Sequence, residues 1–226
     1  VTGWMNNPKT LFDEKILQKG AEIVKKTNEE VAALLGINPA ARTTCVKPSG
    51  NASVLLMTAS GIHANHSQYY IRRVRSDNKD PLTKFLKDSG FPWEPCVMKP
   101  DSTTVFSFPM SVSPTAVFRD DLTAIQHLDL WLTYQRHWCE HKPSVTISVK
   151  EEEWPEVGAW VWKHFDEITG VSFLPMDGGT YRQAPYETID SALYDKLAAE
   201  MPVGIDWEKF IENTDNVEGA QTLACT

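Results

Sequence analysis

Hydrophobic and polar positions along the chain alternate between the helical period and short apolar runs that are typical of strands. Residues 13–35 place apolar side chains three or four positions apart, which predicts an amphipathic helix that Gly36 can end in the left-handed conformation. Further helices are predicted at 52–57, 122–138, 155–165 and 189–199. Strands are predicted at 43–47, 69–75, 104–108, 145–149 and 171–174. Because the two kinds of element alternate, we expect an α/β fold.

The composition is that of a folded chain with a large core. The 226 residues are 42% hydrophobic and include 8 Trp, 9 Phe and 6 Tyr, which excludes a largely disordered chain. No run approaches the roughly 18 apolar residues of a membrane span, and no secretory signal pattern opens the chain. Four widely spaced cysteines without a C-x-x-C motif suit a reducing compartment. We therefore expect a cytoplasmic location and no membrane partner.

The charge balance narrows the class of ligand. Lys plus Arg number 22 against 30 Asp plus Glu, which gives a net charge of −8. Proteins that bind nucleic acid normally carry a basic excess that releases counterions from phosphates, so we expect no nucleic-acid partner. Small phosphorylated ligands stay possible, because backbone amides at helix starts bind anions whatever the net charge.

The segment between the predicted strand 43–47 and the predicted helix 52–57 is the candidate ligand site. Small and polar side chains here let a phosphate approach the backbone, and the first turn of a helix offers free N–H groups. The candidate phosphate-binding residues are Pro48, Ser49, Gly50, Asn51, Ala52 and Ser53. The alternative is an ordinary capped helix start, since Ser and Asn are favoured N-caps. Neither the Walker pattern nor G-x-G-x-x-G occurs here.

Four sequence blocks resemble the large catalytic subunit of ribonucleotide reductases. They read CVKPSGNASVLL, SGIHANHSQYYIRRVR, QRHWCEHKPSVTISV and LPMDGGTYRQAPYE, and they follow one another in the order found in that family. The chain most resembles the C-terminal part of the class II enzyme, of the monomeric ribonucleoside-triphosphate reductase type. This resemblance implies that residues 1–211 form a portion of a ten-stranded α/β barrel. It also implies that residues 212–226 form an incomplete flexible redox tail.

The resemblance further implies an activity, the reduction of ribonucleoside triphosphates to deoxyribonucleotides by thiyl-radical chemistry with adenosylcobalamin. The loop that matches residues 48–53 would bind the substrate's phosphates. Cys225 would be the first of two tail cysteines that carry electrons from a thioredoxin-like reductant, with its pair partner absent. No N-x-C-x-E pattern of the radical cysteine occurs, so we expect this cysteine and most of the cobalamin site upstream of Val1. The remainder of the reductase chain is then a required partner, and this chain alone should be inactive.

Two other functions stay open from the sequence. One is a non-catalytic domain that binds a phosphorylated ligand through the same loop. The other is a zinc peptidase, because His137, Glu140 and His141 match the H-x-x-E-H pattern. Pro143 is expected to end the helix close to the second histidine, which weakens that alternative, and we expect no metal site.

The remaining polar residues of interest have simpler interpretations. Arg72, Arg73 and Arg75 alternate across a predicted strand, so we expect salt bridges and no continuous basic patch. His63 and His66 follow the candidate loop and are interpreted as polar loop residues.

Overall fold

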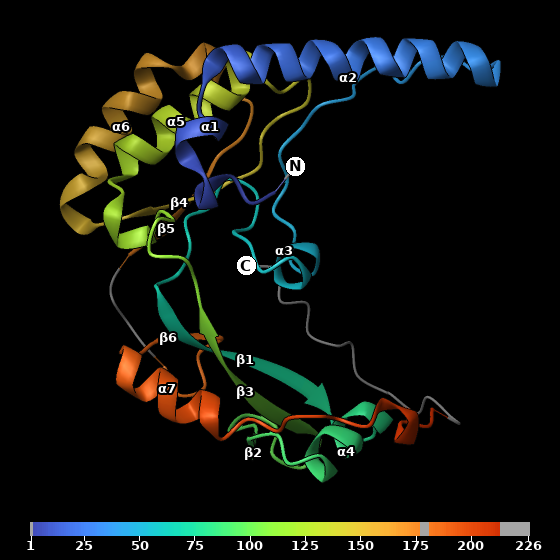
Figure 1. Cartoon of the computed structure of the whole chain (residues 1–226). Helices are drawn as coiled ribbons and strands as arrows, with labels where there is room; N and C mark the ends of the chain where they lie inside the picture. The colour runs from blue at the N-terminus through green and yellow to red at the C-terminus, as the bar shows by residue number, and fades with distance from the viewer. Residues whose placement is uncertain (1, 177–180, 213–226) are drawn as a thin grey trace. The chain divides into compact units, whose positions relative to one another are not determined.

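A computed structural model describes residues 2–176 and 181–212 of the chain. Contacts between residues divide it into two compact units, the first of residues 1–65 and 112–178 and the second of residues 66–111 and 179–226. Each unit has its own sheet and its own helices (Figure 1). Among the described helices, none combines the length and apolar character needed to cross a membrane.

The first unit contains a β–α–β arrangement. Strands β4 (Thr146–Val149) and β5 (Ser172–Pro175) pair in parallel, and α6 (Trp154–Lys163) lies between them in the sequence. Two long helices, α2 (Glu14–Leu35) and α5 (Ala124–His137), contact each other. The shorter helical elements are η1 (Trp4–Asn6), α1 (Pro8–Leu11), α3 (Ala52–Leu55), η2 (Arg119–Asp121), η3 (Glu151–Glu153) and η4 (Phe165–Glu167).

Helix α2 has a capping residue at each end. The Asp13 side chain accepts a hydrogen bond from the Ile16 amide at 3.0 Å, and Gly36 ends the helix with a φ of 67°. Near its start α2 packs Leu17 into the core, and its C-terminal half extends past α5 and α6 (Figure 1). Leu34 and Leu35 are accordingly exposed.

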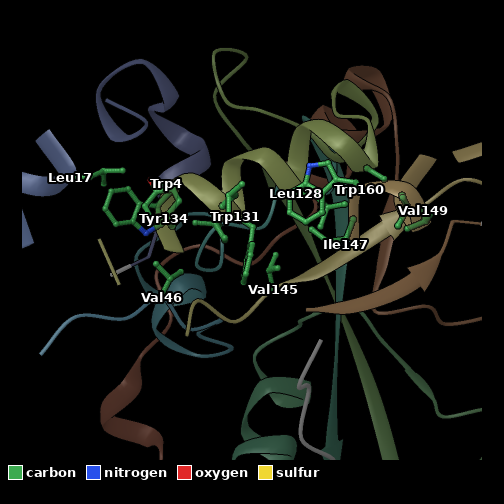
Figure 2. Close-up of a cluster of buried hydrophobic side chains, with 14 residues drawn as sticks. Trp4, Leu17, Val46, Leu128, Trp131, Tyr134, Val145, Ile147, Val149 and Trp160 are labelled. Carbon is green, nitrogen blue, oxygen red and sulfur yellow. The ribbon is translucent and has the colours of Figure 1, made fainter. Parts of the chain in front are cut away.

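The core of the first unit lies between α5 and the parallel strands (Figure 2). Helix α5 starts with a reciprocal capping box between Thr123 and Gln126, and it buries Leu128, Trp131 and Tyr134 completely. Trp131 donates its indole N–H to the Pro143 carbonyl at 2.9 Å, so its polar atom is satisfied inside the core. The core side chains labelled in Figure 2 are Trp4, Leu17, Val46, Leu128, Trp131, Tyr134, Val145, Ile147, Val149 and Trp160.

The second unit is a four-stranded antiparallel sheet in the order β2-β3-β1-β6. Its long central pair is β1 (Tyr69–Asp77) with β3 (Thr103–Ser111), in a register that joins Tyr69 to Ser111 and Asp77 to Thr103. The remaining elements are β2 (Trp93–Pro95), β6 (Tyr186–Thr188), α4 (Pro81–Asp88), α7 (Ser191–Ala199) and η5 (Trp207–Lys209).

The mixture of helices and sheets agrees with the expected α/β class, and two predicted elements need correction. Residues 43–47 form no strand, because the Thr44 and Val46 carbonyls bond the amides of the loop 140–144 and not a sheet ladder. The helix predicted at 52–57 ends at Leu55, and Met57 takes a left-handed φ of 51°. The six strands of the described residues form these two sheets. A ten-stranded barrel is not seen among them.

Candidate functional site

The candidate loop, residues 48–53, lies on the surface of the first unit and has unused main-chain donors. Gly50, Asn51 and Ala52 are exposed, and their N–H groups find no hydrogen-bond acceptor among the described residues. Asn51 occupies the N-cap position of α3 with helical φ and ψ, and its side chain makes no capping bond. Three consecutive exposed amides can together bind an oxyanion.

Hydrogen bonds among three serines, Ser49, Ser53 and Ser60, hold the loop. Ser53 is buried, and its hydroxyl donates to the Ser49 carbonyl. The Ser49 amide in turn donates to the Ser60 hydroxyl at 2.8 Å. The neighbouring Lys47 donates its ammonium group to the Ser144 hydroxyl at 2.6 Å. The loop is therefore shaped by hydrogen bonds that leave the amides of 50–52 free.

The N-terminal segment is hydrogen bonded to residues 59–61, which follow the loop and α3. The Thr2 hydroxyl donates to the Ala59 carbonyl and accepts from the Gly61 amide, both at 2.9 Å. The Asn6 carboxamide oxygen accepts from the Ala59 amide at 2.8 Å. Gly61 has a φ of 58°, and a Cβ there would lie 3.0 Å from the Lys47 carbonyl oxygen. Gly61 thus approaches the backbone at Lys47, next to the loop, so closely that any larger residue there would be strained.

Two histidines bond the segment that follows α3, at the carbonyls of Ser60 and Ile62. His63 is within 2.9 Å of the Ser60 carbonyl and accepts from the Thr146 amide at 3.0 Å. The buried His127 places its Nε2 2.8 Å from the Ile62 carbonyl. Burial lowers the pKa of both groups below the ordinary value of 6.5, that of His127 to about 4. Both imidazoles are therefore neutral at pH 7.

The sequence predicted the loop, but not the residues that support it. Thr2, Asn6 and Ser60 carry no motif, and only Ser60 is close to the loop in the chain. Cys225 lies outside the described residues, as does the predicted tail 212–226 apart from Glu212. Its proposed redox role stays a prediction.

The H-x-x-E-H residues do not form a zinc site. Helix α5 ends at His137, so His137 and His141 do not share a helical face. Glu140 accepts from the Thr43 amide and hydroxyl, both at 2.8 Å, and these bonds hold its pKa below the usual range. Within residues 2–176 and 181–212, no cluster of three or more His, Cys, Asp or Glu is placed to bind a metal. The peptidase alternative thus has no geometric support.

The three arginines of β1 have separate partners within the second unit. Arg73 pairs with Glu187, and Arg75 donates to the Gln183 carbonyl at 2.9 Å. The Arg72 guanidinium lies 4.2 Å from the centre of the Tyr186 ring. Among the residues that the structure describes, only Arg73 of the three makes the expected salt bridge, and the three do not act as one basic patch.

Comparisons with known proteins confirm the resemblance to class II ribonucleotide reductases. The adenosylcobalamin-dependent ribonucleoside-triphosphate reductase of Levilactobacillus brevis is 29% identical over 199 residues, which cover 86% of this chain and 26% of the relative. The enzyme of the same name from Euglena gracilis is 28% identical, covering 92% of this chain and 29% of the relative. That from Lactobacillus acidophilus is 27% identical and covers 100% of this chain and 32% of the relative.

A solved crystal structure shows the same likeness in three dimensions. It is described as a B12-dependent, class II ribonucleotide reductase, and it superposes with a TM-score of 0.77 at 26% identity. The match covers 85% of this chain and 27% of that one. No protein-family model matches the chain. The chain spans about a quarter to a third of the length of the curated relatives that it matches.

Proposed function

We propose that this chain is part of an adenosylcobalamin-dependent reductase that converts ribonucleoside triphosphates to deoxyribonucleotides. The proposal rests on similarity to reductases of that name along 86–100% of this chain in the three relatives described above. The three-dimensional match to a class II enzyme at a TM-score of 0.77 supports it. Because the chain covers only a fraction of those relatives, the complete reaction requires the remainder of the reductase polypeptide.

In this proposal the loop 48–53 binds the substrate's phosphate groups. The three free amides of Gly50, Asn51 and Ala52 support this role, because phosphate oxygens accept such hydrogen bonds. Helix α3 has only four residues, so its dipole contributes little, and the amides themselves would provide the binding. The loop would hold the nucleotide by its phosphates and leave the ribose to be reduced by groups outside this chain.

The groove found beside helix α2 does not suit the cobalamin. A groove of about 400 Å³ lies beside the C-terminal half of α2, bordered by residues such as Asn28, Val31 and Asn38. None of its lining residues is a histidine or carries a charge. Pockets for drug-sized ligands measure about 300–1,000 Å³, and a corrinoid with its nucleotide tail is larger than such ligands. Adenosylcobalamin, which supplies the radical in enzymes of this kind, would therefore bind mainly to other parts of the enzyme.

We also keep the proposal that Cys225 starts a relay of electrons from a thioredoxin-like protein. The match to the Lactobacillus acidophilus reductase extends over 100% of this chain and so includes this cysteine's region. Its thiolate would attack an active-site disulfide, and a second tail thiol would then release it, leaving the disulfide on the tail. That second thiol is not in this sequence.

A chimaeric enzyme tests the proposed function. Residues 1–226 would replace the matching segment of the Levilactobacillus brevis reductase, and formation of dCTP from CTP would be measured with adenosylcobalamin and dithiothreitol. We expect cobalamin-dependent dCTP formation. A chimaera that folds and binds adenosylcobalamin, yet forms no dCTP, would refute the proposal. CTP binding without turnover would favour the non-catalytic binding domain.

The same chimaera tests the loop. Asn51→Asp places a carboxylate beside the free amides without changing the side-chain volume, so we expect KM for CTP to rise about tenfold through charge repulsion. Asn38→Asp is the matched control, because Asn38 is also exposed and lies in the loop after α2. Equal KM values for the two variants would exclude residues 48–53 as the phosphate site.

A further inference from the structure

We infer that His63 is a positioning residue that ties the loop 48–53 to the edge of the parallel sheet. This inference deepens the proposed function, since the group it positions is the proposed phosphate loop. The connection runs through three hydrogen bonds within the first unit. The Ser49 amide donates to the Ser60 hydroxyl at 2.8 Å, His63 Nδ1 meets the Ser60 carbonyl at 2.9 Å, and the Thr146 amide meets His63 Nε2 at 3.0 Å.

The hydrogen bonds assign the tautomer of His63. An amide N–H can only donate, so Nε2 must accept from Thr146 and cannot carry a proton. The proton of the neutral ring therefore lies on Nδ1, from which it is donated to the Ser60 carbonyl. Burial lowers the pKa of His63 and favours this neutral form. An imidazolium would turn Nε2 into a donor that faces another donor.

One end of this connection is rigid. Thr146 is the first residue of β4, and the next inward-facing residues of that strand, Ile147 and Val149, are completely buried. The His127 ring lies 6.3 Å from His63 at an interplanar angle of 80° and bonds the Ile62 carbonyl. The backbone that precedes His63 is thus held by His127 at Ile62, and the His63 side chain is held by Thr146 of β4.

The other end of the connection reaches the candidate site. Ser60 joins two of these hydrogen bonds. Its carbonyl accepts from His63 Nδ1–H, and its hydroxyl accepts from the Ser49 amide. Ser49 directly precedes the three free amides of 50–52, and its carbonyl also receives the Ser53 hydroxyl. A shift of Ser60 would therefore move the start of the loop. His63 affects the amides without contacting the ligand.

The experiment compares an apolar and a polar substitution of His63 in the full 226-residue chain. His63→Leu removes both side-chain hydrogen bonds and leaves the main-chain bond from the His63 amide to the Ser60 carbonyl, whereas His63→Asn keeps a side-chain donor near the Nδ1 position. We expect hydrogen exchange of the Ser49 amide, which donates to the Ser60 hydroxyl, to rise at least tenfold in His63→Leu and by less in His63→Asn. His164→Leu is the control, since His164 is also half-buried in the first unit but bonds Glu167 and lies away from this connection. It should leave exchange in the loop unchanged.

Two measurements keep the inference open to refutation. Nitrogen-15 shifts of the unaltered protein at neutral pH should show His63 with its proton on Nδ1, and a proton on Nε2 would overturn the inference even if the variants failed to fold. Unchanged exchange of the Ser49 amide in folded His63→Leu would also overturn it. In the chimaeric reductase His63→Leu should raise KM for CTP more than it lowers kcat. The exchange and tautomer results do not depend on turnover, so failure of the proposed activity would be recognised separately.

Discussion

Acidification should destabilise the first unit through His127. Its side chain is 8% exposed, and burial lowers its pKa from 6.5 to about 4. Between these values the unfolded chain binds a proton that the folded chain excludes, so the free energy of unfolding falls as the pH falls. The contribution is complete above pH 6.5 and is lost as the pH reaches about 4.

The magnitude follows from the size of the pKa shift. A difference of about 2.5 units, at about 1.4 kcal/mol per unit, amounts to about 3 kcal/mol below pH 4. At pH 5 about 2 kcal/mol of this is already lost, because the unfolded histidine is almost fully protonated there. Burial also lowers the pKa of His63, which adds to the loss in the same direction.

Urea unfolding at about pH 7 and pH 5 measures the effect. Six of the eight tryptophans belong to the first unit, so their fluorescence reports mainly on it. His127→Gln keeps a donor for the Ile62 carbonyl and cannot titrate, so we expect it to lose about 2 kcal/mol less than the unaltered chain between the two pH values. His141→Gln, at an exposed position, should behave like the unaltered chain. An equal loss in His127→Gln would refute the assignment of this pH dependence to His127.

Two further substitutions test the packing of the first unit. Trp131→Ala removes a fully buried side chain and should lower the free energy of unfolding by about 3–5 kcal/mol, measured by urea titration; a loss below about 1 kcal/mol would contradict the core assignment. Gly61→Ala combines a φ of 58° with a Cβ 3.0 Å from the Lys47 carbonyl oxygen, and it should cost about 1–3 kcal/mol. Gly158→Ala, whose Cβ would meet nothing within 4 Å, should be neutral or slightly stabilising, and thermal unfolding of the pair would show whether the close approach matters.

The helices were the elements most accessible from the sequence. The period of residues 13–35, with Asp13 before it and Gly36 after it, predicted α2 almost to the residue. These signals are local, because capping and helical periodicity involve groups within a few positions of each other. The long strands β1 and β3 were predicted from local signals as well, since β-branched and aromatic residues are frequent along both.

The two three-residue strands, β2 and β6, could not be predicted in this way. Trp93–Pro95 and Tyr186–Thr188 are strands only because β3 and β1 pair with them, and three residues carry no period. For residues 43–47 the prediction was wrong in the opposite way, because a strand was expected and none forms. Their apolar character signalled burial correctly at Val46, but the partners of their carbonyls are irregular loop amides.

By itself the sequence determined the helices, the position of the loop 48–53 and its similarity to class II reductases. The tertiary structure decided how that loop is held. Thr2 and Asn6 bond to Ala59, and Thr146 bonds to His63, which also bonds Ser60. The bonds to Ala59 and the bond from Thr146 to His63 join residues that are 53 to 83 positions apart in the sequence. Hydrogen bonds between groups so far apart leave no period or motif, because only the folding of the core brings their donors and acceptors within reach.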